Sequence, residues 1–456
     1  MFSAFSRIKK HLPLLSALLT AAVLRCGIMI TAASDLSRLY RPDTDLYLKM
    51  AETFASAGNF GGITGRVPLF PALWGAIIAI FPKLHELVTA NILMLFSLLT
   101  VYIVYLCAKE YQKGTENIAA WLFALNITSV ANAPMLLTDT LFAFLAALQT
   151  LFIFKYLRSN CGKYFISAII FAAVGTLLRP INLLFPLCAI VILFAPGKPA
   201  LKNKIFSGTI ALLLTAAIVL PWMLRNDRYG AGITIDTNTG AMYHQNGAML
   251  LAEVSNSDFE SVKAKIISEM NVEFQNTAKY PDEKSREAYR IKKYRSLVLK
   301  HPFVWLKQQL NFATLLPDAP TFLELAGATT PNRGTMGVLA KDGVFAAVKH
   351  YFNGKYGLIF LLLPLLAVSA ITLLGTVWYI TQKLYLRNRE SLVVLVLFAL
   401  LIWYYLFLPG AISAPRYHLP VLPCACTFAA VSIAEAIHLI RRRKENSADT
   451  AESGSR

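Results

Sequence analysis

The sequence predicts an all-α integral membrane protein with about ten transmembrane helices, from its composition and its hydropathy pattern. Of its 456 residues, 56% are hydrophobic and only 15% are charged, and the mean hydropathy is +0.52. A soluble domain needs more charged surface than this, so most of the chain is expected to lie in lipid. The net charge of +18 comes mostly from short cationic clusters between apolar segments, which is typical of membrane topology and not of nucleic-acid binding.

A transmembrane helix needs about 20 mostly apolar residues. Stretches of this kind lie roughly at 12–33, 86–108, 117–134, 136–157, 164–179, 180–196, 205–224, 356–380, 391–409 and 416–439. Two further apolar patterns, Thr44–Ala57 and the proline-bounded Pro68–Lys83, are too short to span. We expect them to form interfacial helices in the first outer loop.

A basic cluster with Lys9 and Lys10 precedes the first predicted span, and further clusters follow every second span as far as Arg441–Arg443 after the last one. Cytoplasmic loops carry an excess of Lys and Arg, so both termini are predicted to face the cytoplasm. The first outer loop and the long segment 225–355 are then extracytoplasmic. The pattern suits the inner (plasma) membrane of a bacterium, with the first apolar stretch retained as an uncleaved span rather than removed as a signal peptide.

This topology divides the chain into four predicted parts. Residues 1–224 form an N-terminal membrane module of seven spans, with the first outer loop at 34–85. Residues 225–355 form an α-rich extracytoplasmic cap, and residues 356–440 form a C-terminal membrane module. Residues 441–456 form a polar tail that is expected to be disordered.

Four arginines fall at the outer level of the membrane: Arg66, Arg179, Arg225 and Arg416. The positive-inside bias depletes cations at this level, so their presence suggests an anionic ligand. A lipid phosphate is suitable, because guanidinium binds phosphate through two parallel hydrogen bonds. The alternative is that these side chains snorkel to headgroups or stabilise helix C-termini.

Carboxylates on the same side are fewer, namely Asp43, Asp45, Glu52 and Asp139. Transfer of a group to a hydroxyl or amine needs a base to take the acceptor proton, and Asp43 or Asp45 is placed for that role. The alternative is that either aspartate only caps the helix that begins near Thr44, and that Asp139 only interacts with a helix dipole. His244 is a candidate substrate contact, although a lone histidine usually binds neither substrate nor metal.

In this order and on this side of the membrane, the residues resemble the GT-C superfamily of polytopic glycosyltransferases, above all protein O-mannosyltransferases and lipid A aminoarabinose transferases. Those families show an Asp four residues before a Tyr, a Gly-containing turn, and a basic residue shortly before a Pro-aromatic run. The matching positions are Asp43, Tyr47, Gly58 and Arg66 in RVPLFP. The similarity continues in LLTDTLF, LLRP, PWMLRN and RYHLPVLP.

The resemblance implies an inverting glycosyltransferase that moves a hexosyl or pentosyl group from a polyprenyl-phosphate donor to a glycan, lipid or protein acceptor outside the cytoplasm. Asp43 then corresponds to the catalytic base and Arg66 to a donor-phosphate contact. The other substrate contacts would be Asp45, Tyr47, Asp139, Arg179, Arg225, His244 and Arg416. The sugar and the acceptor vary within the family and are not predicted.

Two departures from the family pattern concern metal binding. Thr44 stands where an acidic residue often follows the catalytic Asp, and Gly65 stands at the acidic metal-ligand position of the aminoarabinose enzymes. The sequence therefore predicts no cofactor and does not support a divalent metal. The alternative function is a transporter or flippase of lipid-linked sugars, which would favour inverted repeats and charges near the bilayer midplane. The sequence is poor in such midplane charges; Arg25, inside the first predicted span, is the exception and has no explanation from the sequence.

Overall fold

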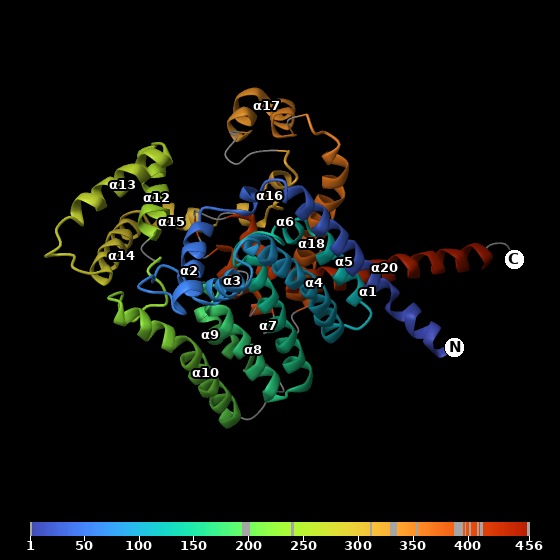
Figure 1. Cartoon of the computed structure of the whole chain (residues 1–456). Coiled ribbons are helices and arrows are strands. Elements are labelled where there is room, and N and C mark those ends of the chain that lie inside the picture. The colour runs from blue at the N-terminus through green and yellow to red at the C-terminus, as the bar shows by residue number, and fades with distance from the viewer. Residues whose placement is uncertain are drawn as a thin grey trace.

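The structure is a computed structural model that describes residues 2–193, 201–238, 241–310, 312–328, 335–352, 354–386, 395–396, 398–400, 403–407, 410 and 414–453. The described part of the chain is helical and contains no β-strand. The helices form a membrane body, a cap of short helices to one side, and two long terminal helices that leave the body on the opposite side (Figure 1). The predicted all-α membrane class is confirmed.

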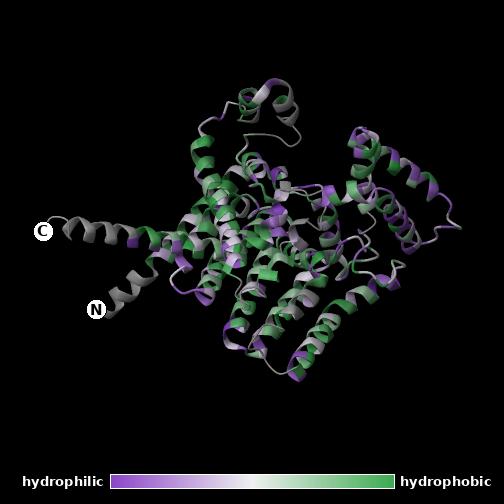
Figure 2. Ribbon diagram, turned by 180° about the vertical axis from the view of Figure 1, so that it is seen from behind, coloured by the Kyte–Doolittle hydropathy of each residue, from purple (hydrophilic) through white to green (hydrophobic). Residues whose placement is uncertain are grey.

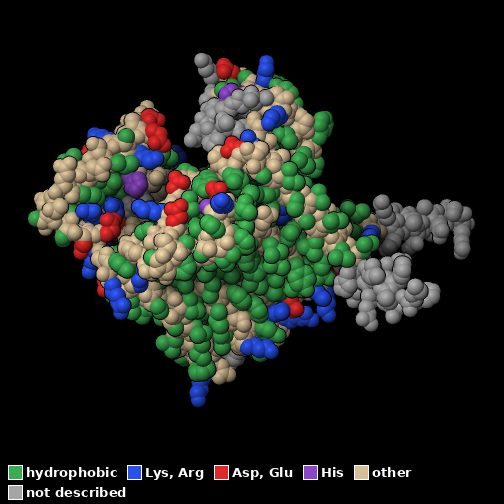
Figure 3. All heavy atoms as spheres, viewed as in Figure 1, with side chains coloured by type: hydrophobic (Ala, Val, Ile, Leu, Met, Phe, Trp, Pro, Cys, Tyr) green, Lys and Arg blue, Asp and Glu red, His purple; other side chains and the backbone are tan. Residues whose placement is uncertain are grey.

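Within the described residues, six helices are long and apolar enough to cross a membrane. They are α1 (Phe2–Ala32), α4 (His85–Tyr111), α7 (Asp139–Ser159), α10 (Leu201–Arg228), α18 (Leu358–Leu386), and η5 (Pro415–Val421) together with α20 (Leu422–Ser453). Hydrophobic residues run along these helices, whereas the cap is more hydrophilic (Figure 2). In the space-filling view the apolar side chains cover the body, and many of the Lys and Arg side chains gather at its lower rim and over the cap (Figure 3).

The other four predicted spans are shorter, broken or only partly described. The stretch 117–134 forms α5 (Glu116–Leu125) and α6 (Ile127–Ala131), and the stretch 164–196 forms α8 (Gly162–Thr176), η2 (Pro180–Leu184) and α9 (Phe185–Leu193). The side chain of Asn126 accepts hydrogen bonds from Thr128 N and Ser129 N, which ends one helix and begins the next. Of 391–409, the structure describes a few residues, including the π-helix η4 (Trp403–Phe407). Ten full spans therefore remain a prediction.

The first outer loop forms η1 (Leu36–Leu39), α2 (Thr44–Ala57) and α3 (Leu69–Ile80), so both short helices form close to where the apolar patterns predict them. Gly58 ends α2 with φ of 66°, the left-handed conformation that favours glycine at this position. Gly75 lets α3 approach α2 closely, because a Cβ there would lie 2.6 Å from the Ala51 carbonyl oxygen. Whether the pair lies at the membrane surface remains a prediction.

Arg25 lies fully buried in the body and has no acidic partner in the described structure. Its guanidinium donates to Ser97 Oγ at 2.8 Å, Ser129 Oγ at 2.7 Å, and the carbonyl oxygens of Ala21 and Ala124 at 3.2 Å each. The Ala124 carbonyl lies beside the break between α5 and α6. Arg25 therefore ties α1 and α4 to this interrupted helix.

The cap consists of α11 (Ala241–His244), α12 (Asn246–Ser255), α13 (Phe259–Glu273), α14 (Glu283–Lys300) and α15 (Pro302–Gln309). It has a small core of its own around Ile266 and Met270. The start of α1 and the end of α20 lie together on the side of the body away from the cap (Figure 1), an arrangement that suits the expected topology. The orientation of the termini in a membrane remains a prediction.

The chain returns to the body after the cap, so the segment 225–355 is not one unit. It forms η3 (Phe312–Leu315), α16 (Ala319–Leu325) and α17 (Thr335–Phe352). Asp318, at the start of α16, accepts a hydrogen bond from Asn132 Nδ2 at 2.8 Å, and its backbone N–H donates to Thr128 Oγ1 at 3.0 Å. At the other end of the chain, α20 continues to Ser453, through most of the tail expected to be disordered. That segment contains several strong helix formers (Arg, Lys, Glu and Ala).

Candidate functional site

Three arginines and two aspartates from separate parts of the chain meet in one ion-paired group, which we call the arginine–aspartate cluster. Asp43 lies 2.7 Å from Arg66 (Oδ1 to Nη2) and 3.6 Å from Arg416 (Oδ2 to Nη2). Asp139 pairs with Arg179, and its Oδ2 lies 3.7 Å from Arg416 Nε. Arg416 thus bridges the two aspartates.

Asp43 occupies the residue before α2, but it does not act as a helix cap. Its side chain makes no capping hydrogen bond and is directed to Arg66 and Arg416 instead. The neighbouring Thr44 is buried; its hydroxyl accepts from the Arg41 N–H at 3.0 Å and donates to the Leu136 carbonyl at 3.2 Å. These bonds fix the start of α2, so the Asp43 carboxylate, with a side-chain exposure of 45%, faces the cluster while remaining accessible.

Asp139 and Arg179 come from α7 and from the connection between α8 and η2. Asp139 is the first residue of α7, and its side chain is only 4% exposed. The Arg179 guanidinium lies 5.1 Å from the ring centre of Tyr417 and 5.9 Å from that of Phe142. The aromatic faces and the carboxylate together hold this cation in place. The dipole of α7 adds a favourable term to the buried Asp139 carboxylate.

Tyr47 positions Arg66. Its buried ring lies 5.5 Å from the Arg66 guanidinium carbon and 5.5 Å from the ring of Phe70 in an edge-to-face arrangement. The backbone N–H of Leu69 donates to the Leu177 carbonyl at 3.0 Å, so the Arg66 loop is joined to the segment that carries Arg179. This hydrogen bond fixes the position of the Arg66 loop relative to the segment that carries Arg179.

Arg225 is not part of the cluster in the described structure. Its guanidinium donates to the carbonyl oxygens of Ile63, at 2.7 Å, and of Gly61, and it packs on the rings of Trp222 and Tyr229 at 4.5 Å each. These contacts fix the position of the loop that precedes Arg66. Arg225 therefore supports the cluster from outside it.

Three other candidates lie apart from the cluster. Asp45 and Glu52 are exposed on α2 and have no ion-pair partner among the described residues. His244 ends α11 in the cap, where burial and the nearby cations Arg290 and Lys263 lower its pKa. Its Nδ1 is buried and has no hydrogen-bond partner in the described structure. No described contact joins His244 to the cluster.

Asp236 was not predicted as a site residue, although Arg66 acts on it electrostatically. It is 6% exposed in the segment after α10, which is held by hydrogen bonds from Thr237 N to the Thr64 carbonyl and from Trp222 Nε1 to the Ile235 carbonyl. Burial raises the pKa of Asp236 to about 6, although the nearby Arg66 opposes the shift. No spacing in the sequence distinguishes this residue, because it lies in a polar loop without periodicity.

Comparison with known proteins agrees with the family pattern. Residues 66–224 match the profile of the dolichyl-phosphate-mannose-protein mannosyltransferase family. The predicted resemblance to GT-C glycosyltransferases is confirmed. The matched GT-C segment includes Arg66, Asp139 and Arg179, whereas Asp43 and Arg416 lie outside it. None of the curated proteins compared with the chain matches it.

Solved structures of a GT-C enzyme have the same general fold. The apo crystal structure of the Archaeoglobus fulgidus oligosaccharyltransferase matches at a TM-score of 0.51 and 14% identity, over 96% of this chain and 52% of that one. The same enzyme in complex with Zn and sulfate matches at 0.50 and 14% identity, over 94% and 50%. The present chain thus spans about half the length of this archaeal oligosaccharyltransferase.

The cluster is poorly suited to a divalent cation. Both of its carboxylates are already ion-paired to arginines, and Arg416 lies between them. A metal ion there would face three positive guanidinium groups, which raises its electrostatic cost. Among the residues that the structure describes, no group of three or more His, Cys, Asp or Glu side chains is arranged to hold a metal.

Proposed function

We propose that the chain is an inverting glycosyltransferase that transfers a hexosyl or pentosyl group from a polyprenyl-phosphate carrier to a glycan, lipid or protein acceptor. The reaction takes place on the extracytoplasmic face of a bacterial inner membrane. The observation that carries this proposal is the arginine–aspartate cluster, in which an accessible carboxylate lies beside guanidinium groups suited to a phosphate. The GT-C fold and the mannosyltransferase match support glycosyl transfer from such a donor.

Asp43 is the base in this mechanism. Its carboxylate takes the proton from the acceptor hydroxyl or amine as the acceptor atom attacks the anomeric carbon. The bond from that carbon to the phosphate oxygen breaks, and its electron pair leaves with the lipid phosphate. A single displacement of this kind inverts the anomeric configuration, so one base is sufficient.

Arg66, Arg179 and Arg416 stabilise the charge that develops on the leaving phosphate. Preformed donors aimed at developing charge lower the barrier more than donors that must reorient. Arg66 and Arg416 also pair with Asp43, which keeps this carboxylate oriented before the donor enters. Tyr47 and Arg225 act as positioning residues for Arg66. Asp45 and His244 are assigned to weaker substrate contacts at the edge of the site.

The test is transfer of labelled sugar in proteoliposomes that contain the full chain, a polyprenyl-phosphate sugar and a panel of acceptors. We expect Asp43→Asn to reduce turnover by on the order of 10²–10⁴-fold, the usual contribution of a general base. Glu52→Gln is the matched control, because its carboxylate is exposed on the same helix, has no ion-pair partner in the described structure and has no role in this mechanism.

Equal activity of Asp43→Asn and the unchanged protein would contradict the assignment of the base. A melting temperature within a few degrees of the parent, as expected for a half-exposed side chain, separates loss of chemistry from loss of fold. Movement of intact lipid-linked sugar across the bilayer, without transfer, would instead favour the flippase alternative.

A further inference from the structure

The cap exposes large hydrophobic side chains on one pair of helices. Between residues 241 and 310, five such side chains lie between the middle of α14 and the residue that follows α15: Ile291, Leu299, Phe303, Leu306 and Leu310. Phe303 is 85% exposed and Leu299 is 70% exposed. The rest of the described cap exposes three, Met242, Val254 and Val272, on three different helices. Contiguous exposed apolar residues on a soluble part of a protein mark an interaction surface.

The spacing within each helix places these residues on one side of it. Ile291 and Leu299 lie eight residues apart on α14, and Phe303 and Leu306 lie three apart on α15, on the far side of the break at His301. The opposite side of α15 is packed on the cap: Trp305 Nε1 donates to Tyr294 Oη at 3.1 Å, and Gln308 Nε2 donates to the Met249 carbonyl at 3.2 Å. The apolar side is therefore the unpartnered side.

Cations flank this apolar stripe. Lys292, Arg295 and Lys300 are exposed, and none of them has an ion pair with an acid in the described structure. The two acids of α14, Glu283 and Glu287, are instead paired with Arg290. An exposed apolar stripe with free cations beside it complements an anionic lipid surface better than it complements water.

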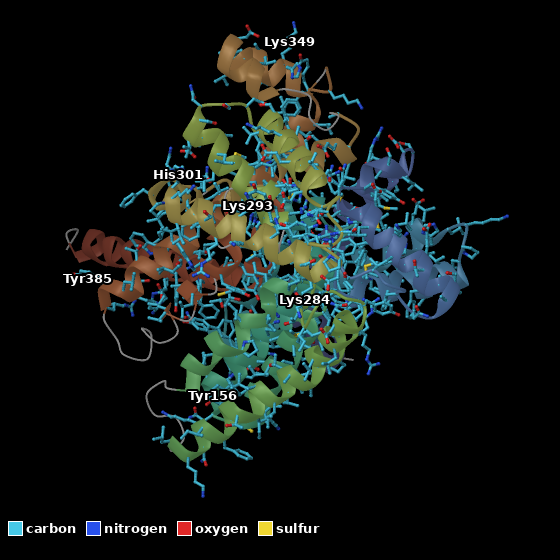
Figure 4. The ribbon with its side chains drawn as sticks, turned by 90° about the vertical axis from the view of Figure 1, so that its left-hand side faces the viewer. Tyr156, Lys284, Lys293, His301, Lys349 and Tyr385 are labelled. Carbon is cyan, nitrogen blue, oxygen red and sulfur yellow. The ribbon has the colours of Figure 1, made fainter. Side chains whose placement is uncertain are left out.

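The stripe is also continuous with the membrane body. Shortly after Leu310 the chain forms η3, and the carbonyl of Thr314 bonds to His418 Nδ1 at 2.6 Å. His418 lies near the start of the candidate span Pro415–Arg442, so α15 ends close to the edge of the bilayer. Figure 4 shows Lys284, Lys293 and His301 in sequence from the middle of the molecule toward its edge, so that α14 directs the stripe outward.

We propose that this face of α14 and α15, which we call the cap foot, lies on the outer leaflet as a monotopic membrane contact. Its apolar residues enter the headgroup region, and Lys292, Arg295 and Lys300 bind lipid phosphates. The cap foot is a second attachment that holds the cap above the arginine–aspartate cluster. The first attachment is the covalent chain that joins the cap to the body at both of its ends. The proposal depends on membrane insertion of the body and not on the reaction that the cluster carries out.

The test places an environment-sensitive fluorophore on Phe303→Cys, with Val272→Cys as the matched control. Val272 is an apolar residue on α13 that is 65% exposed and lies outside the stripe. Both labels are introduced into a full chain in which Cys26, Cys161 and Cys188 are replaced by alanine. The proteins are reconstituted in vesicles of phosphatidylethanolamine and phosphatidylglycerol, with a nitroxide-labelled lipid as the quencher.

We expect the label at 303 to shift to shorter emission wavelength and to lose most of its fluorescence to the lipid quencher, whereas the label at 272 keeps its fluorescence. Charge reversal at Lys292, Arg295 and Lys300 should weaken the quenching at 303 in anionic vesicles. Equal quenching at both positions would overturn the proposal. A wavelength shift at 303 without lipid quenching would also overturn it, because the occupant would then be protein, such as a second copy of the chain.

Discussion

Two of the places where this protein buries arginine have surroundings that differ in kind. Arg25 is fully buried and donates to four uncharged oxygens from α1, α4 and the α5–α6 break. In the arginine–aspartate cluster, the arginine side chains are 12–23% exposed and face two carboxylates. The Arg25 site is buried and contains only uncharged partners, whereas the arginine–aspartate cluster is accessible and contains both positive and negative groups.

The difference shows how a structural cation is distinguished from a functional one. Arg25 supplies the donors that a broken helix lacks, since a buried carbonyl without a partner is costly. The cluster keeps unused donor capacity: Nε of Arg66 and Nε of Arg416 have no hydrogen-bond partner in the described structure, although a guanidinium carries five N–H donors. Unused capacity beside an accessible carboxylate is what a ligand site requires.

The comparison predicts the largest loss of stability at the Arg25 site. Arg25→Met should lower the free energy of unfolding by roughly 3–5 kcal/mol, since each buried group left without its partner costs about 1–3 kcal/mol. The measurement is the melting temperature in detergent, with activity assayed per folded molecule. Arg158→Met is the control, because Arg158 is 52% exposed and makes a surface ion pair. A stable Arg25→Met protein that had lost activity would reverse the assignment.

A substitution in the arginine–aspartate cluster should reduce activity strongly and stability little, the opposite of Arg25→Met. Arg416→Gln removes the cation that bridges Asp43 and Asp139, and we expect sugar transfer to fall by on the order of 10²–10³-fold, the effect of deleting one stabilising donor. The melting temperature should change much less than in Arg25→Met. Arg416→Lys, which keeps the charge without the planar fork, should recover part of the rate. A large thermal loss with an unchanged rate per folded molecule would make Arg416 a second structural arginine.

Asp236 adds a further case to the comparison of buried charged groups. It is a buried carboxyl whose pKa is affected by Arg66, one of the arginines of the cluster. Burial raises the pKa of Asp236 to about 6, so this carboxyl stays neutral to a higher pH in the folded state than in the unfolded state. Ionisation is then more costly in the folded protein, and the stability that Asp236 contributes is lost as the pH rises from about 4 through about 6. Of the charged groups around it, Arg66 lowers the pKa of Asp236 and Glu287 raises it.

We therefore expect Asp236→Asn to remove a stability difference of about 3 kcal/mol between about pH 4 and pH 8. The measurement is the melting temperature across that range for the variant and its parent. The Asn protein should be the more stable one at the upper end and equal to the parent at the lower end. Parallel curves for the two proteins would show that Asp236 does not titrate in this window.

Hydropathy identified the long helices, because about 20 apolar residues in a row can be stabilised only by lipid or a large core. Ten full spans are not confirmed, and the interruptions have local reasons. The Asn126 side chain caps α6 and interrupts the predicted span 117–134, and a short 3-10 helix begins at Pro180, the first residue of the predicted span 180–196. Such breaks depend on hydrogen bonds that a hydropathy average cannot represent.

The structure brings together some of the candidate residues and leaves others apart, while their roles remain predictions. Asp43, Arg66, Asp139, Arg179 and Arg416 were identified by their motifs and by their shared level in the membrane, and the structure brings them together. Arg225 fitted the same criterion, but its donors are taken by the carbonyls of Gly61 and Ile63. Membrane level is a single coordinate, so it cannot distinguish a side chain that faces the site from one that faces a nearby loop.

Sequence by itself determined that this chain is a helical membrane protein with polar segments on one side, because length and hydropathy are properties of the residues alone. It also determined that arginines and aspartates stand at the ends of those helices. Only the tertiary structure decided which of them pair, that Arg25 is closed off by neutral oxygens, and that Arg66 acts electrostatically on Asp236. Those outcomes depend on distances between residues that are far apart in the chain, which packing sets and local pattern does not.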